Sequence, residues 1–371
     1  MSKRAHSILF RVEIIIACVV IVALMRAAFA QTASVPAPSA AAPAPGSDAP
    51  HVIGIAFVGR TVSDLDRSVA FYTALGFKQD MRANPEWRTD DVTERMYGVP
   101  KGTRTRMAKM LMNSNSSGKD FAVYLREFKG IGQKNVSNHT PWTPGAPHFG
   151  LVVADAEALW AKLKATGQLK ARSWGGELIA PPGQTKKMLA YLTDPDGLDI
   201  EIIDQRPATP AQDGRPARPA MTPGISHVGL VILDADKARA FYEKLLGGRL
   251  VNAEQPWLKG DFYDSAVGGH GNILRFFNES FAEAADTAAR LNFEMVEFQN
   301  RKQPVESYTI HDVSTSYVGF EVKDLDGFLA RAKAAGAKQV SDAGIVTMRS
   351  GTRAVIIRDP DVGGFVELYE H

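Results

Sequence analysis

The sequence predicts an α+β fold made of four copies of one β-α-β-β-β module. A short apolar run opened by a histidine and closed by an aspartate occupies 148–155 and returns at 227–234. Weaker copies at 57–64 and 317–324 carry an aromatic residue in place of the histidine. After each aspartate the apolar spacing changes from the period of a strand to that of a helix. Four repeats of one strand-to-helix transition therefore organise the chain.

A second level of repetition groups the modules in pairs. Phe71, Tyr72 and Trp87 of the first module return 170 residues later in the third. Asp-Pro-Asp turns begin at Asp194 and Asp359, in the second and fourth modules only. Landmarks that recur at a fixed offset indicate a duplicated two-module unit.

The first thirty residues resemble a secretory signal. Lys3 and Arg4 precede an apolar run at 14–24, and Ala-Phe-Ala ends the segment at residue 30. The run is short for a membrane span, so we expect export to the periplasm, with an uncleaved inner-membrane anchor as the alternative. Residues 31–50, rich in Ala, Pro and Ser, are predicted to form an extended tether.

The repeats divide the rest of the chain into two predicted domains of two modules each, 51–205 and 224–371. A linker rich in Pro, Ala and Arg joins them at 206–223. Helices are expected at 64–76, 92–97, 155–167, 234–248 and 324–336. Strands that follow the helices are expected at 106–112, 121–128, 188–192, 198–203, 272–277, 292–298 and 364–369.

Composition narrows the range of partners. The formal charge of +2 gives no signal for nucleic acid or for an anionic membrane surface. The only cysteine is Cys18, inside the predicted signal, so no disulfide or thiol chemistry is expected in the mature protein. We predict a small-molecule partner, no nucleic acid and no stable membrane insertion after signal cleavage.

The module resembles the vicinal oxygen chelate superfamily, which includes glyoxalase I, methylmalonyl-CoA epimerase, extradiol dioxygenases and bleomycin-resistance proteins. The resemblance rests on the opening His-x-x-apolar strand, on the helix start at 64–68 with Phe71 and Tyr72, and on the Asp-Pro-Asp-Gly turn before the last strand. It covers nearly all of 52–371. It implies that modules pair into two half-barrels of curved sheet, each able to surround a metal.

The resemblance also implies one metal ligand from the first strand and one from the last strand of each module. In module order the positions are Phe57 and Glu127, His148 and Glu201, His227 and Glu297, and Tyr317 and Glu367. We predict a metal site of His148, Glu201, His227 and Glu297, with Glu127 and Glu367 as weaker candidates. Glu294 rivals Glu297, and only the offset from Glu127 favours the latter. Two imidazoles and two carboxylates suit Zn, Ni, Co, Mn or Fe(II).

How the modules pair decides which donors meet. Neighbouring modules can pair, which is the simpler connection and the one we favour. Each half would then have one histidine and two glutamates. Alternatively, the two inner modules pair with each other and the outer two do the same, as in single-chain four-module glyoxalases. This exchanged arrangement would bring both histidines to one point.

Three functions remain open at this stage. The first is a metal-dependent lyase or isomerase of the glyoxalase type, in which Glu201 or Glu297 is the general base; a glutathione-dependent lyase is a narrower form of it. The second is an Fe(II) dioxygenase of the extradiol type. The third is a metal-free binding protein of the bleomycin-resistance type. Candidate pocket residues for an organic substrate are Trp87, Trp257, Met110, Met112 and Phe276.

Overall fold

The computed structural model describes the chain from residue 51 onward, apart from several short stretches. The described ranges are 51–83, 85–115, 120–180, 187–205, 221–247, 249–251, 256–280, 291–342 and 344–371. The predicted signal and tether, and most of the predicted linker, lie outside them. Within the described ranges, no helix has the length and hydropathy needed to cross a membrane.

Each module starts with a strand that runs into an aspartate-capped helix, as predicted. The four first strands are β1 (His51–Thr61), β6 (Pro147–Val153), β9 (Gly224–Ile232) and β14 (Ser316–Lys323). The helices that follow them are α2 (Leu65–Ala74), α4 (Ala156–Ala165), α5 (Ala235–Leu246) and α7 (Leu325–Ala334). The residue before each helix accepts a hydrogen bond from a first-turn N–H, in Asp64, Asp155, Asp234 and Asp324 alike.

The remaining strands complete the four modules. The first module adds β2 (Lys78–Gln79), β3 (Arg88–Thr89), β4 (Arg104–Asn113) and β5 (Asp120–Lys129). The second adds β7 (Leu189–Thr193) and β8 (Asp199–Asp204). The third adds β10 (Arg249–Val251), β11 (Leu258–Lys259), β12 (Ile273–Ser280) and β13 (Asn292–Phe298). The fourth adds β15 (Lys338–Gln339), β16 (Val346–Thr347), β17 (Arg353–Arg358) and β18 (Phe365–Glu370).

Short helices occur at equivalent places in the first and third modules. The helix α3 (Asp91–Tyr97) was predicted, whereas α6 (Asp261–Val267) was not. The N-cap of α6 is Gly260, which offers no side-chain hydrogen bond, so the usual start signal is missing from the sequence. The second module has instead a 3-10 turn, η1 (Trp174–Gly176).

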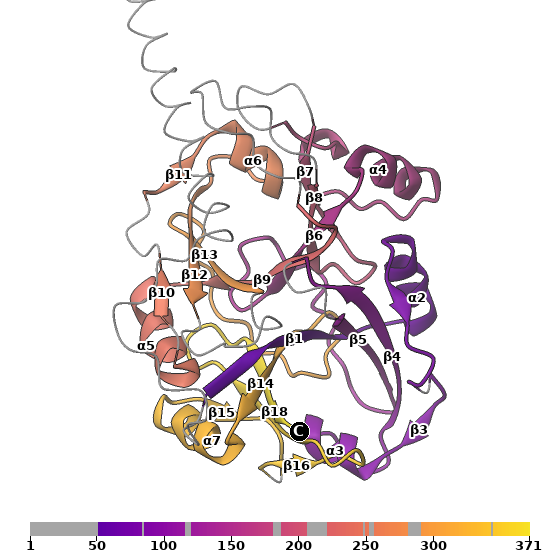
Figure 1. The fold of residues 1–371 in the computed structure, drawn as a ribbon, viewed down its shortest axis with the longest axis vertical. Coiled ribbons are helices and arrows are strands. Elements are labelled where there is room, and N and C mark those ends of the chain that lie inside the picture. Colours follow the sequence, from indigo (N-terminus) through magenta and orange to yellow (C-terminus); the bar gives the residue numbers. More distant parts are fainter. Residues whose placement is uncertain are drawn as a thin grey trace, which may run out of the picture.

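The strands form two curled sheets, one above the other in Figure 1. One sheet has the order β15-β17-β18-β14-β1-β5-β4-β2 and joins the first and fourth modules; we call it the outer half-barrel. The second has the order β10-β12-β13-β9-β6-β8-β7 and joins the second and third modules; we call it the inner half-barrel. First and last strands run parallel within a module, and the first strands of paired modules run antiparallel.

The exchanged pairing is therefore confirmed, and the pairing of neighbouring modules that we favoured is wrong. Connection length misled the prediction, because it says nothing about which first strands fit side by side. The predicted domain ranges, 51–205 and 224–371, each contribute one module to each sheet.

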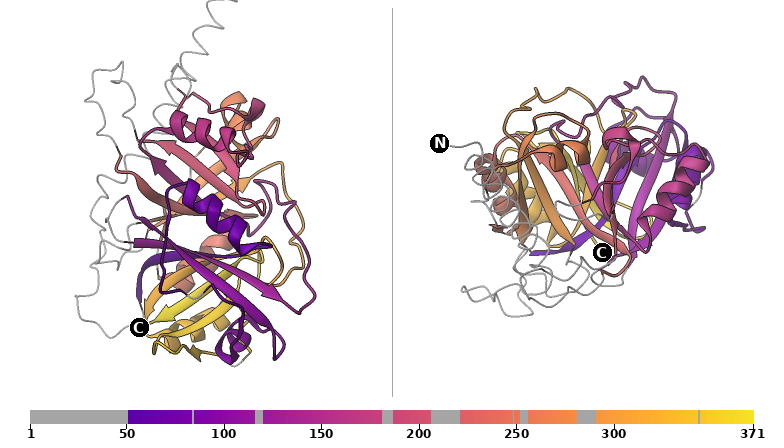
Figure 2. Two further views of the ribbon diagram at one scale, coloured as in Figure 1. Left: turned by 90° about the vertical axis from the view of Figure 1, so that its right-hand side faces the viewer. Right: turned by 90° about the horizontal axis from the view of Figure 1, so that it is seen from above.

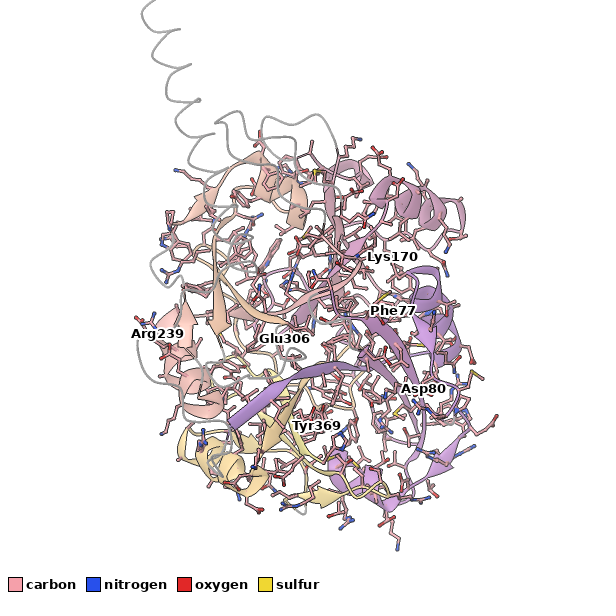
Figure 3. All side chains as sticks on the ribbon, in the orientation of Figure 1. Phe77, Asp80, Lys170, Arg239, Glu306 and Tyr369 are labelled. Carbon is pink, nitrogen blue, oxygen red and sulfur yellow. The ribbon has the colours of Figure 1, made fainter. Side chains whose placement is uncertain are left out.

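The helices lie on the outside of the curved sheets, two by two. In Figures 1 and 2, α2 lies beside α4 and α5 beside α7. Lys162 of α4 donates to the carbonyl of Ala74 at the end of α2, and Lys244 of α5 donates to that of Ala334 at the end of α7. One continuous apolar core joins both sheets to these four helices, while separate apolar clusters fill the concave side of each half-barrel. Figure 3 labels Phe77 of the shared core and Tyr369 of the outer concave cluster.

A buried ion pair ties the two half-barrels together. Arg60, at the end of β1, lies 3.3 Å from a carboxylate oxygen of Asp194, and both side chains are fully buried. The Tyr72 hydroxyl donates to the same carboxylate at 3.1 Å. Asp194 opens the Asp-Pro-Asp-Gly turn of the second module, so this turn anchors the inner half-barrel to the outer one.

Candidate metal centre

Two histidines face each other across the middle of the inner half-barrel. His148 on β6 pairs with Gly229 on β9, and His227 on β9 pairs with Gly150 on β6. A Cβ atom at Gly229 would lie 1.9 Å from the His148 ring, and one at Gly150 would lie 2.2 Å from the His227 ring. Both positions therefore require glycine, because each ring lies over the neighbouring strand. The ring centroids are 5.4 Å apart.

Two glutamates approach these imidazoles from the flanking strands. Glu201 lies on β8, beside β6, and its Oε2 is 3.2 Å from Nε2 of His227. Glu294 lies on β13, beside β9, and its Oε1 is 3.4 Å from Nε2 of His148. Candidate ligand atoms of His148, His227 and Glu294 all lie within 4.8 Å of one another. The structure thus unites three predicted ligands with Glu294.

The donor set fits a divalent metal. Nε2 of His148 and Nε2 of His227 are buried and have no hydrogen-bond partner among the described residues, although each has a carboxylate close by. The Ser226 hydroxyl lies 3.2 Å from the Gly150 carbonyl, to which it donates, and 3.0 Å from Nδ1 of His227. The hydroxyl oxygen of Ser226 then accepts a hydrogen bond from Nδ1–H of His227. In this tautomer the proton is on Nδ1, so the lone pair of Nε2 is free to bind a ligand. A hydrogen bond on the far nitrogen is how metal-binding histidines are held in proteins.

The charges at this site are coupled. Burial disfavours the imidazolium of His227, but Glu294 and Glu201 outweigh it and raise the pKa of the ring. Burial likewise disfavours the Glu294 carboxylate, yet His227 and His148 outweigh it and lower its pKa. The two shifts have one cause, the attraction between imidazole and carboxylate in a buried place. A bound divalent cation would supply the positive charge that a proton on His227 supplies here.

Glu297, the fourth predicted ligand, lies elsewhere. Its carboxylate accepts hydrogen bonds from Arg275 at 2.8 Å and from Lys302 at 2.7 Å. Side chains alternate along a strand, so Glu294 and Glu297, three residues apart, lie on opposite faces of β13. The structure therefore corrects the assignment of Glu297 as ligand and base: Glu294 is the residue beside the histidines.

Glu127 occupies the same structural position in the first module. It accepts a hydrogen bond from the backbone N–H of Leu65 at 2.9 Å and pairs with Arg106 at 2.7 Å. Asp204 and Glu370 likewise accept from the backbone at the starts of α4 and α7. A carboxylate here satisfies free N–H groups and complements the positive end of the helix dipole. Glu127 is thus a helix-capping residue and not a metal ligand.

A signal in the sequence could have separated the two roles. Three modules end in acidic pairs spaced by three, namely Glu201 and Asp204, Glu294 and Glu297, and Glu367 and Glu370. Aligning these pairs assigns the first member to the concave face and the second to the cap. The offset of 170 residues related Glu297 to Glu127 correctly, but both lie on the strand face opposite that of Glu294 and Tyr124. The concave position of the first module is Tyr124, which pairs with β1 as Glu294 pairs with β9.

The outer half-barrel repeats this geometry without imidazoles. Phe57 and Tyr317 each lie over a glycine of the other's strand, as the histidines do. The last-strand positions are Tyr124 and Glu367. The Tyr317 hydroxyl is hydrogen-bonded to that of Tyr97 at 2.5 Å. Among the described residues, Glu367 belongs to no group of metal-binding side chains.

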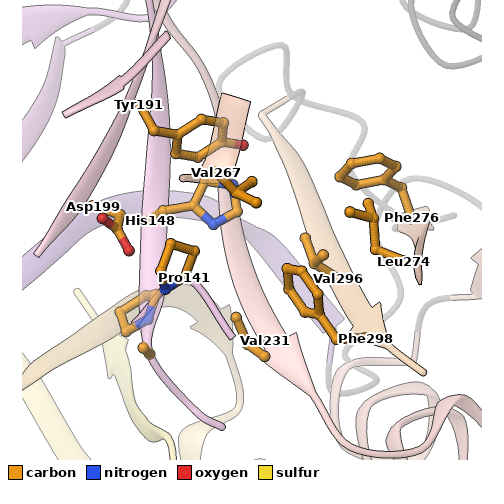
Figure 4. Close-up of a pocket in the computed structure, with 12 residues that line it drawn as sticks. Pro141, His148, Tyr191, Asp199, Val231, Val267, Leu274, Phe276, Val296 and Phe298 are labelled. Atoms are coloured by element: carbon orange, nitrogen blue, oxygen red, sulfur yellow. The ribbon is translucent and has the colours of Figure 1, made fainter. Parts of the chain in front are cut away.

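A pocket opens beside the candidate metal ligands of the inner half-barrel (Figure 4). Its apolar wall consists of Val231, Val267, Leu274, Phe276, Val296 and Phe298. Its polar edge is formed by His148, Tyr191 and Asp199. Burial raises the pKa of Tyr191 well above its ordinary value, so the phenol stays protonated and can donate a hydrogen bond.

Of the five residues predicted to line a substrate pocket, Phe276 does so. Trp87 and Trp257 instead cover arginines, with the guanidinium carbons of Arg106 and Arg275 at 5.1 and 4.4 Å from the ring centroids. Met110 is buried in the shared core and Met112 packs against it. Packing therefore explains these four residues.

Comparison with known proteins gives one family and several relatives. The family model described as Glyoxalase/Bleomycin resistance protein/Dioxygenase superfamily matches residues 54–202 and 224–364. "Probable lactoylglutathione lyase, chloroplastic" of Arabidopsis thaliana is 26% identical over 220 residues, 58% of this chain and 49% of that protein. "Lactoylglutathione lyase GLX1" of the same plant is 27% identical over 202 residues, 53% of this chain and 56% of that protein. The chain spans about half the length of the curated relatives it matches.

A solved structure of glyoxalase I from Zea mays is also similar. It has a TM-score of 0.49 and 20% sequence identity, and the match covers 87% of this chain and 92% of that one.

Proposed function

The chain belongs to the Glyoxalase/Bleomycin resistance protein/Dioxygenase superfamily, and on that premise we propose that it is a divalent-metal-dependent lyase or isomerase. The inner half-barrel would hold the ion through His148, His227, Glu201 and Glu294. The substrate is a small organic molecule with two adjacent oxygens. The observation that supports this proposal is that ligand atoms of His148, His227 and Glu294 lie within 4.8 Å of one another, with a Glu201 oxygen 3.2 Å from Nε2 of His227.

The chain's own residues have separable tasks. When bound, a divalent ion supplies Lewis-acid stabilisation of negative charge on the substrate oxygens. Glu201 or Glu294 accepts the proton from the substrate carbon, since each carboxylate lies within 3.4 Å of one of the two imidazoles. Tyr191, protonated and at the pocket edge, donates a hydrogen bond to the reacting end of the substrate. The apolar wall holds the remainder of the substrate and excludes water.

The pocket lining bears on the choice of substrate. The curated relatives are named for lactoylglutathione, a molecule with two carboxylates and an ammonium group. The described lining of this pocket contains no lysine or arginine, and its one carboxylate, Asp199, is paired with Arg172 at 2.8 Å. These observations favour a smaller and less charged substrate than a glutathione conjugate.

A second candidate is an Fe(II) dioxygenase. The side chains of His148, His227 and Glu294, grouped within 4.8 Å, have the composition of the two-histidine, one-carboxylate triad that holds Fe(II) with open positions. Oxygen consumption with catechols, measured on iron-loaded protein, would establish this candidate. Proton exchange at a substrate carbon without oxygen uptake would establish the isomerase.

The decisive experiment is metal analysis of the purified full chain after mild dialysis. We expect about one divalent ion per chain, because the two imidazoles and the carboxylates beside them form one site. Less than about a tenth of an ion per chain would end the proposal and leave a metal-free binding protein. Reloading with Zn, Ni, Co, Mn or Fe(II), followed by thermal unfolding, then identifies the ion that stabilises the fold most.

We also propose that the protein is exported to the periplasm, because residues 1–30 have a basic start, a short apolar run and a small-x-small end. N-terminal sequencing of protein recovered from the periplasmic fraction should begin at Gln31. A chain that retains Met1 and sediments with membranes would instead support an anchor.

A further inference from the structure

The concave face of the outer half-barrel contains an arginine without an acidic partner. Arg126 on β5 is 9% exposed, and none of the described carboxylates forms an ion pair with it. Its contacts are neutral: Nη1 lies 3.4 Å from the Thr105 hydroxyl, Nη2 lies 3.2 Å from the Met107 sulfur, and the guanidinium lies 4.6 Å from the Tyr97 ring centroid. Nε is buried and has no hydrogen-bond partner.

The nearby carboxyl group does not compensate this charge. Burial, only partly offset by Arg126, raises the pKa of Glu367 to about 8, so the group is mostly neutral near pH 7. A buried cation without a counter-charge is unfavourable, and proteins keep few of them. Arg126 therefore lacks a counter-charge, which a bound anion would supply.

The free part of Arg126 has the shape that a carboxylate recognises. Nε and Nη2 form one edge of the guanidinium, and two parallel N–H groups on that edge match the two oxygens of a carboxylate. Nε has no partner and Nη2 contacts only a thioether. Methionine side chains are flexible, so movement of the partly exposed Met107 would uncover the edge.

The surroundings add a second cation and flat apolar walls. Met107, Lys109 and Leu111 of β4 pair with Arg126, Tyr124 and Ala122 of β5, so all six side chains share the concave face.

Lys109 is partly exposed; its ammonium lies 4.0 Å from a carboxylate oxygen of Asp80 and 5.6 Å from the centroid of the Tyr124 ring. The Phe57 ring packs edge-on against Tyr124, with centroids 4.9 Å apart. Flat aromatic surfaces beside two cations suit an aromatic anion.

We propose that the outer half-barrel is a second ligand site, which binds a small flat organic carboxylate through the Nε and Nη2 edge of Arg126. The carbon frame of the ligand packs against the rings of Phe57 and Tyr124, and Lys109 contributes long-range attraction. No metal takes part. The two half-barrels would therefore bind different chemical classes on one scaffold.

The test uses benzoate as the probe and benzamide, its uncharged counterpart, as the control. Titration calorimetry on the full, metal-loaded chain should give a Kd for benzoate below about 5 mM, an affinity within reach of so small a ligand. Benzamide should bind at least about tenfold more weakly, because it lacks the charge.

Variants then locate the binding. Arg126→Met should weaken benzoate binding at least about tenfold, whereas Arg104→Met, an exposed arginine of the adjacent strand, should leave it unchanged. Arg126→Met should also fold and raise the Tm, since it removes an uncompensated charge. Binding that survives in Arg126→Met but is lost in His148→Ala would place benzoate at the metal centre and overturn the proposal. Equal binding of benzoate and benzamide, or no benzoate binding at all, would overturn it too.

Discussion

The two half-barrels share one template and differ in what occupies it. Four positions face the centre of each, two on first strands and two on last strands. In the inner half-barrel they are His148, His227, Glu201 and Glu294, and in the outer one they are Phe57, Tyr317, Tyr124 and Glu367. Both keep the glycines that make room for the crossing side chains. The glycine register therefore belongs to the fold, whereas metal binding depends on which side chains occupy the four positions.

The contrast extends to hydrogen bonding. In the outer half-barrel the Tyr317 hydroxyl has a partner in Tyr97, and aromatic rings fill the space around it. In the inner half-barrel Nε2 of His148 and Nε2 of His227 have no hydrogen-bond partner among the described residues, and carboxylate oxygens lie 3.4 and 3.2 Å from them. Unpaired buried polar atoms cost stability, which the paired hydroxyls of Tyr97 and Tyr317 avoid. We interpret the inner arrangement as a site kept open for a ligand.

The largest effect is expected from the imidazoles. His148→Ala or His227→Ala should weaken metal binding at least about a hundredfold, because even the outer partners of ligating histidines are worth about 10–100-fold. Tyr317→Phe, at the equivalent outer position, should leave the metal content unchanged. Metal titration of the three variants tests this difference between the half-barrels. Equal loss of metal in Tyr317→Phe would contradict it.

The next effect separates the two faces of β13. Glu294→Gln should lower metal affinity about tenfold or more, since an amide is a weaker ligand than a carboxylate. Glu297→Gln should keep the metal but lose about 1–3 kcal/mol of unfolding free energy, because Arg275 and Lys302 lose their partner. Metal titration and denaturant unfolding of both variants distinguish the roles. A Glu297→Gln protein without metal would restore the original assignment.

The glycines test the shared template directly. Gly229→Ala and Gly319→Ala should each cost about 2–3 kcal/mol of stability, because the new methyl group overlaps a ring. Only Gly229→Ala should also reduce metal affinity, since the displaced ring is His148 and not Phe57. Denaturant unfolding measures the stability of both variants, and metal titration measures their metal affinity. A neutral outcome in both variants would show that the register is not required.

The last prediction concerns the pH dependence of stability. An unfolded Glu367 loses its proton near pH 4.5, whereas burial, only partly offset by Arg126, raises the folded pKa to about 8. Between these values the folded state holds one more proton than the unfolded state, so stability falls as pH rises. Glu367→Gln should remove a slope of up to about 1.4 kcal/mol per pH unit in that window. Denaturant unfolding from pH 5 to pH 8 measures it, and parallel curves for the two proteins would contradict it.

Much of the fold could be predicted because its signals are local. The aspartate caps of α2, α4, α5 and α7 follow each first strand in the sequence, and the structure has all four. The helix α6 was missed because a glycine precedes it. The pairing of modules is a long-range property. The glycine two residues after Phe57, His148, His227 and Tyr317 lets first strands lie side by side, but because all four modules have it, it does not indicate which of them pair.

The site was predicted in part for a related reason. Both histidines lie in the first strands, where the repeat fixes their position, and Glu201 lies between two isoleucines of its strand. Glu294 and Glu297 are only three residues apart, and the choice between them depends on which face of β13 is concave. Strand alternation separates the two faces but does not say which is which; either the alignment of the acidic pairs or the partner strand β9 decides it.

The exchanged pairing has a consequence for chain integrity. Cutting the chain between residues 205 and 221 would yield two fragments, each with two first strands deprived of their antiparallel neighbours. The exposed strand edges have unpaired backbone N–H and C=O groups, which promote association with strands of other chains. Neither fragment could complete a half-barrel alone, but two fragments together could restore both by complementation.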